Sequence, residues 1–429
     1  MSQLEASFIL AVAVLGFPPL LADGPGPDST TAPRGGAITL ADARRNAVAS
    51  SPALKALEAQ VRAAEGAARQ ARAYSNPELA FEAEDFGASP SLEVKTQRTL
   101  SVGQSVEWFG KRSSRIAAAD RGRDVAAHDL ARGRRDLLTD VDRAFAALLG
   151  AQERAAIAGQ NAATAREVTR AVATLVEAGE ASPVEAARAE SDEALTRIDL
   201  DYAGRDLDLA RRNLARLWGE ESPPFTVASG ELAATADFPD REASLAALAR
   251  LPDLTRWDAE AARQASFALY AGRLALPDLE LSVGTRTWSG LDGRAWVAGV
   301  TLPIPILTQF AGARAEAGAR MEQAALERRA EEVRVRSELL AAHETLARAL
   351  DEARAIREEV LPRAEKVYTA LNEGYRRGKY RLLDLLEARR TLAQTRLRYV
   401  DALVRLATAD ADLRRLIPDP TNDDSGVSR

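Results

Sequence analysis

Apolar and polar residues alternate in two short stretches of a chain that otherwise has the pattern of helices. The stretches are "NPELAFEAEDFG", residues 76–87, and "LPDLELSVGTRTW", residues 276–288. A period of two is typical of a β-strand with one apolar face. A second alternating segment follows each of them. The sequence therefore predicts four strands, over about 78–86, 92–108, 278–288 and 294–303.

Long helices are predicted between and around these strands. No proline interrupts the helix-forming run from Lys111 to Leu175, which would span about 100 Å at ~1.5 Å per residue. A matching run from Gln309 to Asn372 contains Pro362, where we expect a kink. Helices of this length must pack against others along their length.

The strand and helix patterns occur twice, at a nearly constant offset. "SPAL" at Ser51 is matched by "LPDL" 200 residues later, and so is "NPEL" at Asn76. Further on, "GEASPVEAARAE" from Gly179 aligns with "GKYRLLDLLEAR" from Gly378 at an offset of 199 residues. Such a constant offset indicates a tandem duplication of a helix–strand–strand–helix–helix unit. We predict repeats over 38–230 and 231–418, preceded by a signal peptide (1–22) and a linker (23–37) and followed by a disordered tail (419–429).

Four strands cannot close a barrel, and they leave two sheet edges unpaired. Three chains would supply twelve strands, a number found in outer-membrane barrels, whose apolar face meets lipid and whose polar face lines the pore. The fold class is therefore predicted as mainly α with membrane β, assembled as a trimer. The residues expected to face lipid are Leu79, Phe81, Val94, Val102, Leu281 and Val283. Those expected to face the pore are Glu82, Glu84, Glu93, Lys95 and Glu280, although the polar face of a sheet in water would show the same pattern.

Aromatic residues and the N-terminus bear on the membrane question. Trp108, Trp288 and Trp296 fit either an aromatic girdle at the membrane surfaces or ordinary packing at strand ends. The apolar run "FILAVAVLGF", residues 8–17, has the length of an export-signal core, but no basic residue precedes it. An apolar tail or a misassigned start codon is the alternative.

Composition restricts the chemistry of the chain. It has no cysteine, two histidines (His128 and His343) and two methionines, and its net charge is −6. Disulfides, thiolate metal sites and a lipidated N-terminal cysteine are thereby excluded, and a basic nucleic-acid-binding face is not indicated. The phosphate-loop, GxSxG and HExxH motifs are missing, so we expect no enzyme, no cofactor and no resident metal. The two histidines are expected to have surface or packing roles.

The duplicated unit resembles the TolC-like outer-membrane efflux proteins, and within them the cobalt–zinc–cadmium resistance (CzcC-like) branch. The resemblance covers about residues 38–418. It depends on the stretches "SPALKALEAQVRAAEGAARQARAYSNPELAFEAEDFG", "GQSVEWFGKRSSRIAAAD", "RAFAALLGAQER", "VEAGEASPVEAARAE" and "LARLWG". It implies a homotrimer in the outer membrane, with a 12-stranded barrel continuous with a long periplasmic α-helical barrel. It further implies an exit duct without catalysis, working with a periplasmic adaptor and an inner-membrane RND transporter.

The resemblance also implies roles for the two helix–turn–helix tips, residues 176–186 and 375–387. The adaptor would dock at the residues Gly179, Ser182, Pro183, Gly378 and Arg381. Asp384 and Glu387 match by position the acidic residues that ring the periplasmic aperture in this family, and three copies would form a cation-attracting gate. A solvated pair with Arg381 or Arg390 is the alternative for these two acids.

Other functions stay open on the sequence alone. The exported substrate cannot be read from it, and a duct for drugs or for a type I secreted protein is an alternative to heavy-metal export. A periplasmic coiled-coil scaffold without transport is an alternative of another class, but a scaffold has no use for four amphipathic strands.

Overall fold

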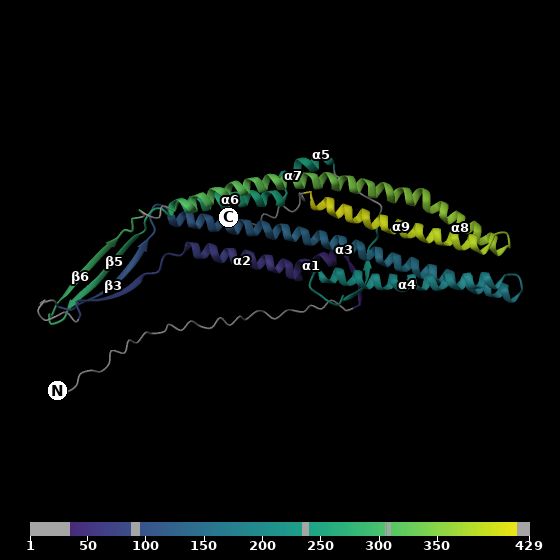
Figure 1. Ribbon diagram of the computed structural model, residues 1–429, viewed down its shortest axis with the longest axis horizontal. Coiled ribbons are helices and arrows are strands. Elements are labelled where there is room, and N and C mark those ends of the chain that lie inside the picture. Colours follow the sequence, from purple (N-terminus) through teal and green to yellow (C-terminus); the bar gives the residue numbers. More distant parts are fainter. Residues whose placement is uncertain (1–34, 87–94, 234–239, 305, 307–309, 418–429) are drawn as a thin grey trace, which may run out of the picture.

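The protein is elongated, with a β-sheet at one end and, at the other end, two turns that each connect a pair of long helices (Figure 1). The computed structural model describes residues 35–86, 95–233, 240–304, 306 and 310–417. The predicted signal peptide and the predicted C-terminal tail lie outside these residues, as does most of the linker.

The elements follow the order expected of two repeats. The first half contains β1 (Gly36–Thr39), α1 (Leu40–Ser50), α2 (Pro52–Arg72), β2 (Glu78–Glu84), β3 (Gln97–Val106), α3 (Lys111–Glu177) and α4 (Pro183–Arg216). The second half contains β4 (Phe225–Ser229), α5 (Arg241–Ala247), a 3₁₀ turn (Leu248–Arg250), α6 (Pro252–Arg273), β5 (Leu279–Trp288), β6 (Arg294–Thr301), α7 (Ala311–Ala355), a π-helical turn (Ile356–Val360), α8 (Leu361–Arg376) and α9 (Leu382–Arg415). Pro52 and Pro252 begin α2 and α6, where a proline costs no hydrogen bond because the first N–H groups of a helix have no intrahelical partner.

Two helical tracks run the length of the body. The predicted helix from Lys111 is continuous as α3 over 67 residues, or about 100 Å. In the second repeat, where a kink was expected at Pro362, a π-helical turn over Ile356–Val360 directly precedes α8, and Pro362 lies in the first turn of α8. Helical backbone therefore continues on both sides of the proline.

A short parallel pair, β1 with β4, was not predicted from the sequence. The side chain of Gln152 on α3 satisfies both backbone groups of Ala228 in β4. Its amide Nε2 donates to the Ala228 carbonyl at 3.0 Å, and its Oε1 accepts from the Ala228 N–H at 2.6 Å. This contact joins β4 to the middle of α3.

Three apolar clusters hold the helices together. One surrounds Leu148, Leu214 and Trp218, a second surrounds Leu339, Leu346 and Leu406, and a third, small one lies beside the two turns. The third consists of Val172, Ala189, Leu382 and Leu386, with Val168, Val176, Ala186 and Tyr375 packed against it. The tips are therefore fixed to each other by packing within one chain.

Candidate functional site

The sheet at one end of the molecule has the strand order β2-β3-β5-β6, with antiparallel neighbours throughout. Each repeat supplies one hairpin, and the pairing of β3 with β5 joins the two hairpins. The outer edges of β2 and β6 have no strand partner within the described part of the chain. The sheet is therefore open on both sides.

The register gathers the apolar side chains on one face. Leu79 lies opposite Val102, which lies opposite Val283 in the next strand. Phe81 and Leu281 share this face by alternation, and all five side chains are exposed, with 66% of Phe81 accessible. A face of exposed large apolar side chains indicates a covering partner or a membrane; contact with lipid stays a prediction. Val94 lies outside the described residues.

The opposite face is polar and partly paired. Arg286 Nε donates to Thr99 Oγ1 at 2.9 Å, and its Nη2 lies 3.7 Å from a carboxylate oxygen of Glu84. Glu82 lies opposite Thr99, and Glu280 is on the same face as Arg286 by alternation. Of the four glutamates predicted to face the pore, the three that the structure describes, Glu82, Glu84 and Glu280, thus share one face of the sheet.

One glycine on the polar face permits close approach of two strands. A Cβ at Gly284 would lie 2.5 Å from the Leu100 carbonyl oxygen and 2.6 Å from Ser101 Cβ. Contacts this short do not occur, so any side chain there would push β5 away from β3.

Two predicted pore residues are not in a described strand. Lys95 was expected within a strand over 92–108, but β3 begins at Gln97, so Lys95 belongs to the connection and the strand assignment for it was wrong. Glu93 lies outside the described residues.

The tryptophans occupy different positions. Trp296 is on the apolar face with 82% of its surface exposed. Trp108 is half exposed, follows the end of β3 and contacts the ring of Phe109 at a centroid distance of 6.5 Å. Trp288 is partly buried at the end of β5, on the polar face. Only the first two positions suit a girdle.

The two turns at the other end are built alike. Gly179 and Gly378 have φ values of +77° and +71°, in the left-handed region that glycine adopts without strain. In the first turn Ser182 caps α4, and the Glu185 carboxylate accepts from the Ser182 N–H at 3.2 Å. In the second turn the Asp384 carboxylate accepts from the Arg381 N–H at 3.3 Å. Asp384 and Glu185 are thus equivalent helix caps.

Asp384 and Glu387 are exposed on one side of α9, while Leu385 and Leu386 are buried on the other. Within the described ranges neither acid forms an ion pair. Arg390, one of the partners considered from the sequence, lies instead 3.5 Å from Asp192. The two acids are therefore free of the alternative pairing, and their gate role stays a prediction.

A buried ion pair above the turns was not foreseen. Arg389, with 4% of its surface exposed, donates through Nη2 to Asp192, which is also buried. Its Nη1 donates to the Asn161 carbonyl at 3.3 Å, so three helices, α3, α4 and α9, meet at this guanidinium. The partners are 197 residues apart in the chain, and no local spacing in the sequence reveals them.

Further ion pairs follow the antiparallel contact of α3 with α9. Arg154 pairs with Asp401 at 2.7 Å, Arg143 with Asp412 at 2.6 Å, and Arg415 with Asp136 at 2.6 Å. Because α3 belongs to the first repeat and α9 to the second, these pairs join the two halves of the chain.

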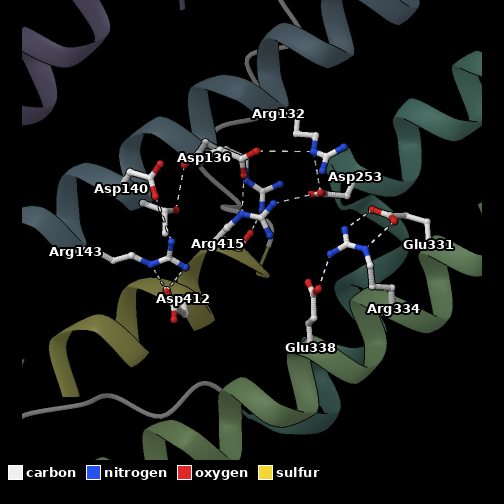
Figure 2. A network of polar contacts seen from close by, with 12 residues as sticks. Arg132, Asp136, Asp140, Arg143, Asp253, Glu331, Arg334, Glu338, Asp412 and Arg415 are labelled. Atoms are coloured by element: carbon white, nitrogen blue, oxygen red, sulfur yellow. Dashed lines mark hydrogen bonds and ion pairs between the residues drawn. The ribbon is translucent and has the colours of Figure 1, made fainter. Parts of the chain in front are cut away.

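Figure 2 shows the end of this contact, where the pairs widen into a network. Asp253, 2% exposed at its side chain, lies 3.3 Å from Arg132 and 3.5 Å from Arg415. Nearby on α7, Arg334 hydrogen-bonds Glu331 and holds the pKa of that carboxyl below its usual value. Charges of both signs alternate in this network, so that it joins α3, α6 and α9 by ion pairs.

The histidines have packing positions. His343 is buried, its Nε2 has no hydrogen-bond partner in the described structure, and burial together with the charge of Arg241 lowers its pKa against an opposing effect of Asp240. His128 Nδ1 lies 3.5 Å from Thr255 Oγ1. In the described ranges there is no group of three or more histidine or carboxylate side chains placed to hold a metal ion. None of the described helices combines the length and apolarity needed to cross a membrane.

Comparisons with known proteins agree with this architecture. The model of the outer membrane efflux protein family matches residues 43–220 and 244–417. The chain is 32% identical to the cobalt-zinc-cadmium resistance protein CzcC of Cupriavidus metallidurans, over 89% of this chain and 90% of the relative. It is 29% identical to the nickel and cobalt resistance protein CnrC of the same organism, over 62% and 63% of the two chains.

Among solved structures, the fold is similar to that of CusC, which was studied for folding and transmembrane channel formation. The TM-score is 0.74 at 15% identity, with 89% of this chain and 92% of the CusC chain covered. At this identity the likeness concerns the fold.

Proposed function

Because the chain belongs to the outer membrane efflux protein family, we propose that it is the outer-membrane exit duct of a tripartite RND-type pump that exports heavy-metal cations. The family is one of outer-membrane transport proteins. The observation that supports a duct is the open sheet with an exposed apolar face at one end of a helical body about 100 Å long.

The duct requires three copies of the chain. In a homotrimer the free edge of β2 in one chain would pair with the free edge of β6 in the next, giving twelve strands without an edge. The face of Leu79 and Phe81 would then meet lipid, and the face of Glu82, Glu84 and Glu280 would line the pore. Long helices α3 and α7 would continue the wall of the duct into the periplasm.

The periplasmic end would carry the gate. Asp384 and Glu387 are exposed beside the second turn and form no ion pair with the described residues, so three copies around an axis would form two acidic rings that attract cations. The turns around Gly179, Ser182, Pro183, Gly378 and Arg381 would receive the adaptor, which connects the duct to the inner-membrane transporter.

Heavy-metal cations are proposed as cargo because three relatives of the chain are named for resistance to cobalt, zinc, cadmium or nickel. An acidic, water-filled lumen suits cations of any kind. Selection among metals is therefore assigned to the transporter rather than to this chain.

Deletion of the gene, followed by growth on a panel of metals and drugs, tests the proposal. We expect lower tolerance to one or more of cobalt, zinc, cadmium and nickel, restored by the wild-type gene and not by Asp384→Arg/Glu387→Arg, which would make the aperture basic. Lost tolerance to drugs alone would exclude metals as the cargo, and unchanged tolerance throughout would exclude efflux.

A further inference from the structure

The apolar face of the sheet carries charge at one level only. Its side chains form rows across the strands, about 7 Å apart along each strand. The row farthest from the helices consists of Ala83, Arg98, Thr287 and Arg294. Within the described strands, Arg98 and Arg294 are the only charged side chains on this face. Both cations therefore lie at the end of the sheet that is remote from the helical body (Figure 1).

Neither of these guanidinium groups is neutralised by the part of the chain that the structure describes. Arg98 and Arg294 are exposed, and their side chains form no ion pair or hydrogen bond with the described residues. On the opposite face, by contrast, Arg286 donates to Thr99 and lies beside Glu84. The fold thus pairs the arginine of the polar face and leaves the two arginines of the apolar face without a counter-charge.

The two arginines are placed to act on one ligand. Only β5 separates their strands, β3 and β6, so the backbones of Arg98 and Arg294 are about 10 Å apart. The residue between them is Thr287, whose side chain is much shorter than theirs. Guanidinium groups bind phosphate through two parallel N–H groups, which gives this pair of cations a preference for phosphate-bearing ligands.

The adjacent row, one step closer to the helices, is mainly apolar and aromatic. It consists of Phe81, Leu100, Thr285 and Trp296. Its three large apolar side chains are at least half exposed. Tryptophan concentrates where the head groups of a membrane meet the acyl chains, and a cation just beyond it is solvated by head groups and water. The two rows together therefore have the composition of a membrane surface contact.

From these observations we propose that Arg98 and Arg294 bind the phosphate groups of a glycolipid in the outer leaflet of the membrane, with Trp296 packed against the same lipid. The inference rests on the proposed function, in which the apolar face meets lipid and the helical body lies in the periplasm. The outermost row of the face is then level with the head groups of the outer leaflet.

The position of the cations favours the outer leaflet over the inner one. A phospholipid head group of the inner leaflet would meet the opposite end of the face. The rows at that end contain Leu279, Leu281 and Val300 and, within the described strands, no cation. A phosphorylated glycolipid of the outer leaflet is therefore the occupant that matches both the charge and its level.

The test measures the binding of lipopolysaccharide to the full-length trimer in detergent. Arg98→Gln/Arg294→Gln is expected to weaken binding by roughly tenfold or more, because each cation near an anionic membrane surface adds to the attraction. Arg98→Lys/Arg294→Lys keeps both charges and should bind more tightly than the glutamine variant. The control Arg329→Gln/Arg348→Gln removes two exposed charges from α7 and should leave binding within about twofold.

Competing ligands identify the group that is bound. Lipopolysaccharide from which the phosphates have been removed should bind the wild type as weakly as the intact lipid binds the glutamine variant. Inorganic phosphate and phosphatidylglycerol vesicles should displace the intact lipid poorly. Equal binding of the two forms of lipopolysaccharide, or efficient displacement by either competitor, would overturn the glycolipid site.

The variants provide the other contrary outcomes. Unchanged binding by Arg98→Gln/Arg294→Gln, or an equal loss in the α7 control, would show that the two arginines do not hold the lipid. Dissociation of the glutamine trimer before lipid is added would assign them to contacts between chains instead. If the wild type binds the lipid but deletion of the gene leaves metal tolerance unchanged, the proposed function fails while the lipid site stands.

Discussion

At the scale of single residues, the buried pair of Arg389 and Asp192 is the contact most sensitive to substitution. Removing one partner leaves the other charge buried without compensation, which costs about 3–5 kcal/mol. We therefore expect Asp192→Leu to lower the melting temperature of the helical body, measured by circular dichroism. Asp192→Leu/Arg389→Met should recover most of the loss, because no charge is then buried alone.

The pair of Arg154 and Asp401 provides the matched control. It joins α9 to α3, as the buried pair joins α9 to α4, but it is partly exposed, and pairs of this kind contribute about 0–1 kcal/mol. If Asp401→Asn destabilised the protein as much as Asp192→Leu, burial would not be the cause of the difference.

His343 predicts a dependence of stability on pH. Its folded pKa is lowered from 6.5 by burial and by Arg241, so below about 6.5 the unfolded chain binds more protons than the folded one. The free energy of unfolding should then decrease as the pH falls through this range.

The measurement compares melting temperatures at pH 7.5 and 5.5. The wild type should lose more stability than His343→Leu, which cannot be protonated there. His128→Leu is the control for the loss of a histidine as such. An identical pH dependence in wild type and His343→Leu would contradict the assignment.

At the scale of elements, two glycines of α3 differ in what surrounds them. A Cβ at Gly150 would collide with Val404 Cγ2 on α9, whereas a Cβ at Gly159 would meet, among the described residues of other elements, Leu200 Cδ1 at 3.9 Å. Alanine is favoured over glycine in a helix by about 1 kcal/mol, but overpacking costs about 1–3 kcal/mol. Gly159→Ala should therefore raise the melting temperature and Gly150→Ala should not.

The sheet offers a comparison of adjacent positions. Phe81 and Glu82 follow each other in β2 and are on opposite faces. An arginine on the lipid face of a barrel costs about 2–4 kcal/mol near the bilayer midplane, whereas one in the lumen is solvated. Phe81→Arg should reduce the amount of protein recovered in outer membranes, and Glu82→Arg should not; equal recovery of both would mean that the apolar face does not meet lipid.

Helices and strands could be predicted from the sequence where the periodic pattern of apolar residues extended over many residues. The period of two gave the faces of Leu79, Phe81 and Val283, and the offset near 200 gave the correspondence of α3 with the track of α7 and α8. The pairing of β1 with β4 could not be found in this way, because strands of four and five residues carry too little pattern. Asp192 and Arg389 could not be paired either, since each looks like an ordinary residue of a solvated helix face.

At the scale of the whole molecule, the open edges predict assembly. In detergent the protein should have three times the mass of one chain, which is 46.0 kDa before removal of the predicted signal peptide, and the trimer should dissociate on heating. Because the chain has no cysteine, one cysteine in β2, at Ala80 or Ala83, and one in β6, at Ala295 or Ala298, can report the contact between chains. At least one combination should give linked dimers and trimers on a non-reducing gel, whereas a cysteine at Ser101 in the interior strand β3 should link no chains; a monomer without crosslinks would exclude the barrel.

The pairing of β3 with β5 has a consequence for the cost of this assembly. It places side by side, within one chain, two hairpins that descend from the same unit, so half of the contacts between hairpins in a twelve-stranded ring are already made within a chain. Each association of separate bodies loses translational and rotational freedom worth about 4–15 kcal/mol. A ring of six unduplicated units would incur that loss at five successive encounters and a ring of three chains at two. Fusion of the two ancestral units thus reduces the translational and rotational entropy that is lost when the pore assembles, because the units are already joined in pairs when the chain is synthesised.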